Sequence, residues 1–182
     1  TQDTSSAASD VYKRQVITGF GRTGSDFGCT TMNIHDPDMM TFAKQLSSAY
    51  MPISASAIRR DVYEAMIDQS AAAGAFGHGY TYSGHPVACA VALRVLEIYE
   101  RDNIFSRASA TGAYLQEQFK KFESHPLVGE VRGRGLLAAL ELVPNKELEH
   151  QFQDGRVGGV AQKMAQDNGL LIRTVAGSSI GI

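Results

Sequence analysis

Lys44 is the residue whose surroundings most suggest chemistry. It is the only charged residue between Met39 and Ile58, and it stands after a short apolar run and before the uncharged segment QLSSAYMPISASAI. A surface lysine normally shares its surface with other charges, whereas in an enclosed site desolvation lowers the pKa of the amine. A neutral amine in such a site can form a Schiff base with a carbonyl compound. We therefore predict that Lys44 is catalytic, the alternative being an ordinary solvated lysine at a strand end.

Two other patterns match known binding motifs, but neither has the context that its motif requires. Gly19 to Gly24 reads GFGRTG and matches GxGxxG, whose glycines must open a helix followed by an acid about 20 residues later. The next segment has no helical period and contains Pro37. His78 and His85 lie in a loop rich in Gly with no third ligand nearby. The sequence predicts neither a nucleotide site nor a metal site.

The composition is that of an ordinary globular protein. The chain has 182 residues with 17 basic and 19 acidic side chains, a net charge of −2, so it lacks the basic surface that nucleic acids or anionic membranes require. Cys29 and Cys89 form no metal-binding or redox spacing. The opening segment TQDTSSAASD has no apolar core typical of a signal peptide. We expect a soluble, cytoplasmic protein.

The hydrophobic pattern predicts an α/β fold. Val16 and Ile17 are expected to end a strand, and Val87, Val91, Val95 and Ile98 to form one face of a helix that begins at Pro86. The helices are expected at 60–73, 86–99, up to 122, and 157–164. The strands are expected at 38–43, within 128–142, at 170–173 and at 179–182.

Four motifs in order resemble class III aminotransferases, in particular the ω-transaminases. They are VITGFGRTG, then PDMMTFAKQLSSAYMPISA, then GHGYTYSGHPVACAVAL, and finally VRGRGLLAALEL with GLLIR. The resemblance covers Val16 to Ile182. It implies a fold type I enzyme with pyridoxal 5′-phosphate that transfers an amino group between an amine or amino acid and a keto acid, as a homodimer whose active sites are shared between subunits.

The resemblance also implies roles for individual residues. Lys44 would hold the cofactor as a Schiff base and carry the proton between the substrate and the cofactor. Val16 would pack on one face of the pyridine ring. Tyr80 and Thr81 would bind the cofactor phosphate of the neighbouring subunit, and Arg173 would bind a substrate carboxylate.

One departure from the family pattern lies just before the first motif. The family has Asp-Glu where this chain has Arg14 and Gln15, and the aspartate would pair with the ring nitrogen. We expect residues 1–15 to be a disordered or misjoined leader, 16–102 the C-terminal part of a large cofactor-binding domain, and 103–182 a truncated small domain. An aminomutase or racemase of the same fold, or a catalytically inactive fragment, remains an alternative.

Overall fold

The computed structural model describes residues 12–146, 156–175 and 179–181, with the side chains of residues 12–14 left out. Its α-helices are α1 (Gly28–Thr31), α2 (Arg60–Ala73), α3 (Pro86–Arg101), α4 (Ile104–Lys120) and α5 (Val157–Asp167), and its 3-10 helices are η1 (Lys44–Leu46) and η2 (Lys121–Ser124). Its strands are β1 (Tyr12–Arg14), β2 (Met39–Phe42), β3 (Ala55–Ile58), β4 (Val128–Arg134), β5 (Leu137–Leu142), β6 (Arg173–Val175) and β7 (Ser179–Gly181).

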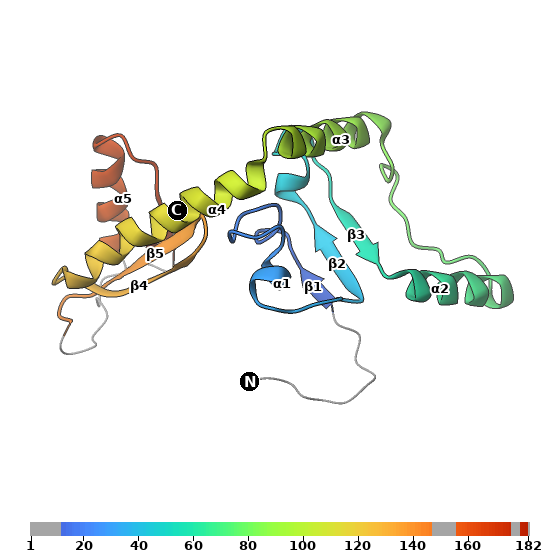
Figure 1. Cartoon of the computed structure of the whole chain (residues 1–182), viewed down its shortest axis with the longest axis horizontal. Coiled ribbons are helices and arrows are strands. Elements are labelled where there is room, and N and C mark those ends of the chain that lie inside the picture. The colour runs from blue at the N-terminus through green and yellow to red at the C-terminus, as the bar shows by residue number, and fades with distance from the viewer. Residues whose placement is uncertain (1–11, 147–155, 176–178, 182) are drawn as a thin grey trace. The chain divides into compact units, whose positions relative to one another are not determined.

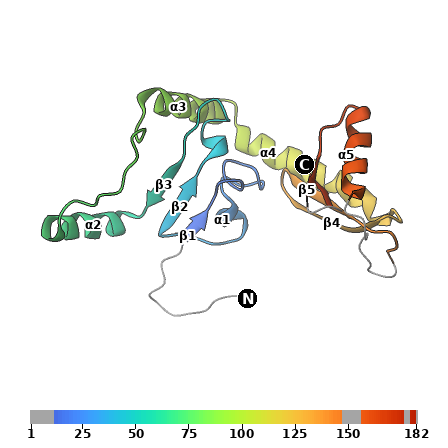
Figure 2. The ribbon, with the colours of Figure 1, turned by 180° about the vertical axis from the view of Figure 1, so that it is seen from behind.

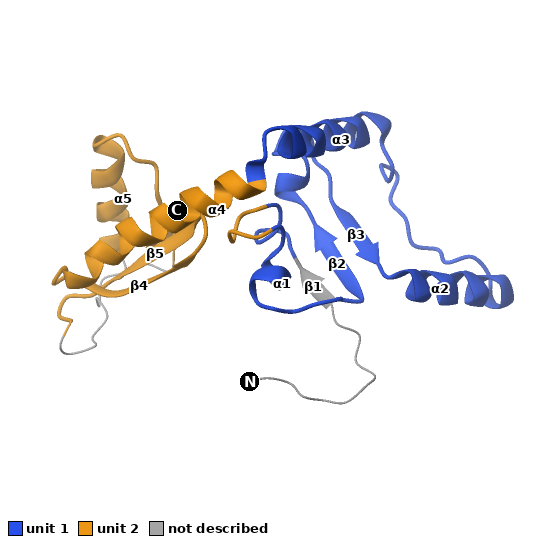
Figure 3. Ribbon diagram, viewed as in Figure 1, with its two compact units in different colours: residues 1–20, 26–104 blue, residues 21–25, 105–182 orange. Residues whose placement is uncertain are grey.

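These elements form two compact units, coloured separately in Figure 3. Unit 1 comprises the described residues of 1–20 and 26–104, and unit 2 those of 21–25 and 105–182. Each unit contains helices and a sheet, so the mixed α/β prediction is confirmed. None of the described helices is both long enough and apolar enough to span a bilayer.

The sheet of unit 1 has three strands in the order β1-β2-β3 (Figures 1 and 2). β1 runs parallel to β2, and β3 runs antiparallel to it. The expected disordered leader is therefore too long: Tyr12–Arg14 pairs with β2, and Gln15 is only 4% exposed. Backbone pairing needs no apolar period, which is why the sequence gives no signal for β1.

An aromatic cluster packs the inner part of unit 1. The ring of Phe20 lies 5.7 Å from that of Phe27 and 5.8 Å from that of Phe42, and Phe27 and Phe42 are 5.4 Å apart. Tyr99 of α3 lies 6.4 Å from Phe20. These distances are typical of favourable aromatic pairs, so they fix α3 against the loops that follow β1 and β2.

Helix α3 begins at Pro86, as predicted, but its buried face differs from the prediction. Ala88, Ala92 and Val95 are buried, whereas Val87 is 54% exposed. Of the predicted face, Val95 is buried and Val91 and Ile98 are half-buried. The buried face is therefore centred one residue further along the helix and includes two alanines. The sequence did not indicate them, because valine is the more hydrophobic residue.

Unit 2 is built on an antiparallel sheet with the order β4-β5-β7-β6. The region 128–142, predicted as strand, is a hairpin of β4 and β5 with its turn at Gly135, and α4 runs alongside it (Figures 1 and 2). Gln116 of α4 donates hydrogen bonds to the carbonyl oxygens of Gly135 and Leu137, at 2.8 and 2.9 Å. Val128, Ala138 and Leu140 form the buried side of the hairpin.

The GFGRTG motif serves packing rather than nucleotide binding. No helix begins at these glycines, and residues 21–25 group with unit 2. The Leu136 N–H donates to the Arg22 carbonyl oxygen at 2.9 Å. A side chain at Gly135 would lie 2.4 Å from the backbone of Thr23 and 2.6 Å from that of Gly24. The glycines thus allow two backbone segments to touch.

The last two strands begin and end differently from the prediction. The expected strand 170–173 is wrong, because Leu170 and Leu171 are exposed coil and β6 begins only at Arg173. β7 covers Ser179–Gly181 of the expected 179–182, and Ile182 lies outside the described residues. The apolar residues Leu170 and Leu171 therefore lie in the segment that leads to β6 and not in the strand itself.

Candidate functional site

The candidate site lies where the parallel strands β1 and β2 end. Arg14 pairs with Thr41, and the Gln15 N–H donates to the Thr41 carbonyl oxygen at 2.9 Å. The carboxyl ends of parallel strands meet at one edge of a sheet, the usual place for ligands in α/β folds. Val16 and Lys44 each follow the end of one of these strands, so the fold brings both to the same edge. Val16 lies in a turn and not, as expected, in the strand.

Lys44 begins a tight turn with unusual backbone geometry. Its φ is +52°, and Ser48 and Ala49 have φ values of +50° and +64°. Residues other than glycine rarely adopt this conformation because it is energetically unfavourable. It persists only where the surrounding structure fixes the backbone. Sequence reasoning singled out Lys44 but could not show this geometry.

Three contacts hold the turn in place. Leu46 is 9% exposed, and Ser47 is 1% exposed, with its hydroxyl donating to the Met51 carbonyl oxygen at 2.6 Å. Tyr99 of α3 donates from its hydroxyl to the Gln45 carbonyl oxygen at 2.9 Å and lies 2.9 Å from the Ser48 hydroxyl. Tyr99 was missed by sequence reasoning because its partners lie more than 50 residues away. Its hydroxyl stabilises the turn that contains Lys44.

The side chain of Lys44 is not enclosed by the described residues. It is exposed, and so are the neighbouring Ser48, Ala49 and Tyr50. The inference from missing charges to an enclosed amine is therefore wrong for this chain, because an uncharged run can be exposed when nothing packs on it.

Gln15 occupies a polar niche beside this edge. Its Oε1 accepts hydrogen bonds from the Gly28 N–H and the Thr18 hydroxyl, both at 2.9 Å. The resemblance implies a glutamate here, and either side chain supplies the acceptor oxygen that these two donors need. The side chain of Arg14, the other departure from the family pattern, lies outside the described residues.

Tyr80 and Thr81 lie on an exposed loop. Tyr80 is 76% exposed, and Thr81 is exposed without a hydrogen bond to another described residue. A hollow of about 520 Å³ lies in unit 2, and a larger one of about 910 Å³ in unit 1 separates 51–55 from the loop and the start of α3. The larger hollow is lined by Tyr80 but not by Lys44, Val16 or Thr81.

Arg173 lies in unit 2, whereas the other four predicted site residues lie in unit 1. It is exposed and begins β6, at the edge of the four-stranded sheet. The expectation that it ends a strand is wrong, because it begins one, but its position in an edge strand lets its exposed guanidinium approach a ligand.

The residues at the β1–β2 edge fit an aldehyde cofactor with an aromatic ring. The exposed Lys44 amine is reachable by a carbonyl carbon, and Val16 is half-buried and apolar. Thr81 lies elsewhere, on the loop before α3, and its exposed hydroxyl is a donor suited to a phosphate oxygen. No group of three or more His, Cys, Asp or Glu side chains able to hold a metal is found in the described ranges.

Comparison with known proteins identifies relatives of one kind. Residues 15–181 match the family described as Aminotransferase class-III. An uncharacterized aminotransferase, y4uB, of Sinorhizobium fredii is 47% identical over 88% of this chain and 35% of its own length. The putrescine–pyruvate aminotransferase of Pseudomonas aeruginosa is 43% identical over 91% of this chain and 36% of its own.

The solved structures give the same picture. The omega transaminase from Pseudomonas jessenii in complex with PMP shares 45% identity and a TM-score of 0.87, covering 94% of this chain and 38% of that one. The chain thus spans about a third of the length of the curated relatives that it matches. The predicted fold, part of a transaminase fold, is confirmed.

Proposed function

Because this chain belongs to the class III aminotransferase family, we propose that it forms part of a pyridoxal 5′-phosphate-dependent transaminase. The enzyme would move an amino group between an amine or amino acid and a keto acid. The observation that carries the proposal is Lys44, held at φ +52° on the carboxyl edge of two parallel strands. The names of two relatives support it: one includes putrescine and pyruvate, and the other is an omega transaminase with PMP bound.

Lys44 and Val16 would do different work at this edge. The bound cofactor supplies the electron-withdrawing ring that stabilises negative charge on the substrate carbon. Lys44 would hold the cofactor through Nζ. It would also take the proton from the substrate Cα and deliver it to the cofactor. Val16 would support one face of the ring. The rigid turn matters because an amine that is misplaced by about 1 Å can lose about 100-fold in rate.

Borohydride reduction of the full-length holoenzyme tests this assignment. The reduced cofactor should remain on the peptide that contains Lys44. Lys120, Lys121, Lys146 and Lys163 provide the internal comparison, since all are available to the reagent but none is at the edge of the parallel strands. A label on any of these, or on Lys13, would end the assignment.

We further propose that Thr81 binds the cofactor phosphate in a neighbouring subunit. The support is its exposed hydroxyl, which has no hydrogen-bond partner among the described residues and is therefore available to a phosphate group. Losing this charge-assisted contact by Thr81→Ala should weaken cofactor binding about 10- to 100-fold.

Mixing two impaired variants tests the shared site. If Lys44 and Thr81 of one site come from different subunits, a mixed dimer of Lys44→Ala and Thr81→Ala holds one intact site. Random mixing should then restore activity to about a quarter of the wild-type value. Mixing each variant with itself is the control, and no recovery in the mixed sample would place both residues in the same subunit's site.

Arg173 would bind the carboxylate of the amino acid or keto acid. Its planar fork suits a carboxylate better than the point charge of lysine does. In the full-length enzyme, Arg173→Ala should weaken the half-reaction with pyruvate about 10- to 100-fold. The half-reaction with a carboxylate-free amine such as putrescine should change little, and equal losses would show that Arg173 is structural.

A further inference from the structure

The strand that carries Arg173 is held at its open edge by one side chain. Gln162 of α5 accepts two hydrogen bonds at Oε1, one from the Thr174 N–H and one from the Thr174 hydroxyl, both at 2.8 Å. Thr174 directly follows Arg173 in β6. Its N–H donates to Gln162 rather than to β7, so the outer edge of β6 is bound at this point by a helix side chain.

β6 is a short edge strand. It has three residues, and among the described strands it pairs with β7 alone, in the register Arg173 with Gly181 and Val175 with Ser179. On α5, Val160 and Met164 are 57% and 62% exposed, whereas Gly158 is buried and Ala161 is half-buried.

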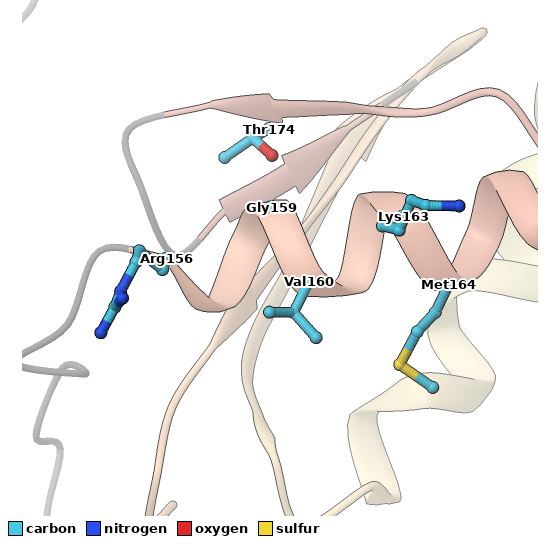
Figure 4. Close-up of a pocket in the computed structure, with 6 residues that line it drawn as sticks. All are labelled: Arg156, Gly159, Val160, Lys163, Met164 and Thr174. Carbon is cyan, nitrogen blue, oxygen red and sulfur yellow. The ribbon is translucent and has the colours of Figure 1, made fainter.

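Thr174 also lines a hollow of about 520 Å³ together with Arg156 and residues of α5 (Figure 4). Gln162 does not line this hollow, and its two hydrogen bonds are the polar link between α5 and β6 that the described residues show.

The neighbouring strand, by contrast, is firmly attached on its other side. Ser179 of β7 is 2% exposed and donates from its hydroxyl to Glu141 of β5. Arg132 of β4 reaches both residues, at 3.3 Å and 3.2 Å, and pairs with Glu130 at 2.6 Å. The hydrogen bonds that Arg132 donates to Glu130 and Glu141 raise the pKa of its guanidinium. β7 is thus anchored in the sheet, and the position of β6 depends on β7 and Gln162.

We propose that Gln162 is a positioning residue for Arg173. Side chains alternate along a strand, so Thr174 faces α5 and Arg173 extends from the opposite face of the sheet. By fixing the backbone of Thr174, Gln162 sets the point and direction from which the guanidinium leaves the sheet edge. The inference rests on the proposed role of Arg173 in carboxylate binding and adds a residue that selects carboxylate substrates without touching them.

Gln162→Met in the full-length holoenzyme tests the proposal. Methionine keeps the length of the side chain but offers only a weak acceptor. We expect the half-reaction with pyruvate to fall about 5-fold, as for one lost hydrogen bond, and the dissociation constant of propanoate, measured by calorimetry, to rise by a similar factor. The half-reaction with putrescine should stay unchanged.

Three further variants serve as controls. Gln162→Glu keeps an acceptor oxygen and should restore near wild-type values for pyruvate and propanoate. Gln166→Met changes an exposed residue of the same helix and should have no effect. Thr174→Val removes one of the two donors without altering α5 and should give a smaller loss for pyruvate, which keeps the test valid if Gln162→Met folds poorly.

The double variant with Arg173→Ala separates this inference from the proposed function. If Gln162 acts through Arg173, adding Gln162→Met to Arg173→Ala causes no further loss for pyruvate. A full additional loss, or equal losses with pyruvate and putrescine, overturns the inference alone. If Arg173→Ala itself does not distinguish pyruvate from putrescine, the proposed role of Arg173 fails, and the inference fails with it.

Discussion

The segment 54–84 of unit 1 and the β4–β5 hairpin of unit 2 have similarly clear sequence patterns, but they differ in burial. In 54–84 only Val62, Met66 and Ser70 are even half-buried, and α2 has no buried residue. In the hairpin, Val128 and Leu140 are 3% and 7% exposed. A pattern therefore predicts the local element, whereas burial requires a surface to pack against.

The two regions differ in where that surface comes from. The hairpin finds it in β7 and α4, which belong to the same unit. Segment 54–84 leaves Tyr63, Ile67 and Phe76 about half or more exposed. In the proposed enzyme, a second subunit and further segments of the chain would supply the missing surface.

Glycine substitutions should separate the two regions most strongly. Gly135→Ala puts a Cβ 2.4 Å from the Thr23 backbone at a φ of +60°, so we expect a loss of about 2 to 4 kcal/mol of unfolding free energy. Gly79→Ala is the control in 54–84, because no atom lies within 4 Å of the added Cβ, and its effect should stay under about 0.5 kcal/mol. Urea unfolding measures both, and similar effects would contradict the difference between the regions.

Truncation of apolar side chains should show a similar but smaller contrast. Leu140→Ala removes a buried side chain of the hairpin and should cost about 2 to 3 kcal/mol, the lower end of the range for Leu→Ala, because the sheet of unit 2 is small. Ile67→Ala acts on a side chain that is 50% exposed and should cost under about 0.5 kcal/mol in the 182-residue chain.

The full-length protein sharpens this second contrast. If a second subunit covers α2, Ile67→Ala lowers the midpoint of thermal unfolding there, and the shift depends on protein concentration. Leu140→Ala should show no such dependence beyond that of the wild type. A negligible effect of Ile67→Ala at every concentration would mean that nothing covers this helix.

Much of the fold could be predicted because its signals are local. The bounds of α2 follow from its period and from Gly74, whose φ is +100°. The start of α3 follows from Pro86. β1 and the bounds of β6 could not be predicted, since both are very short strands that exist through backbone pairing, β1 with β2 and β6 with β7, and have no hydrophobic pattern of their own.

The site was predictable to a similar degree. The position of Lys44 could be found from its isolation among uncharged residues, but not its exposure or its positive φ, since these depend on what packs around it. The Gln162–Thr174 link could not be predicted, because a glutamine on a helix and a threonine on a later strand form no recognisable spacing. Its only signal is geometric.

The smallest expected effect concerns the ion pair that begins α2 in the exposed region. Arg59 donates to Asp61 at 2.6 and 2.5 Å and also pairs with Asp38 at 2.7 Å. The hydrogen bond from Arg59 lowers the pKa of Asp61 from its ordinary value of 3.8 to about 2. Since the folded-state pKa is the lower one, this pair stabilises the folded chain above about pH 4, and the contribution is lost as the pH falls through about 2.

Replacing the arginine should remove this shift while leaving the helix largely intact. In Arg59→Met, the titration midpoint of the Asp61 carboxyl carbon, followed by NMR, should return toward 3.8. Arg94→Met removes a similar exposed partner, that of Glu97, and should leave the Asp61 midpoint unchanged. Because both pairs are solvent-exposed, the effect on unfolding should be slight. An unchanged midpoint in Arg59→Met would mean that the arginine does not hold the Asp61 carboxylate in the folded chain.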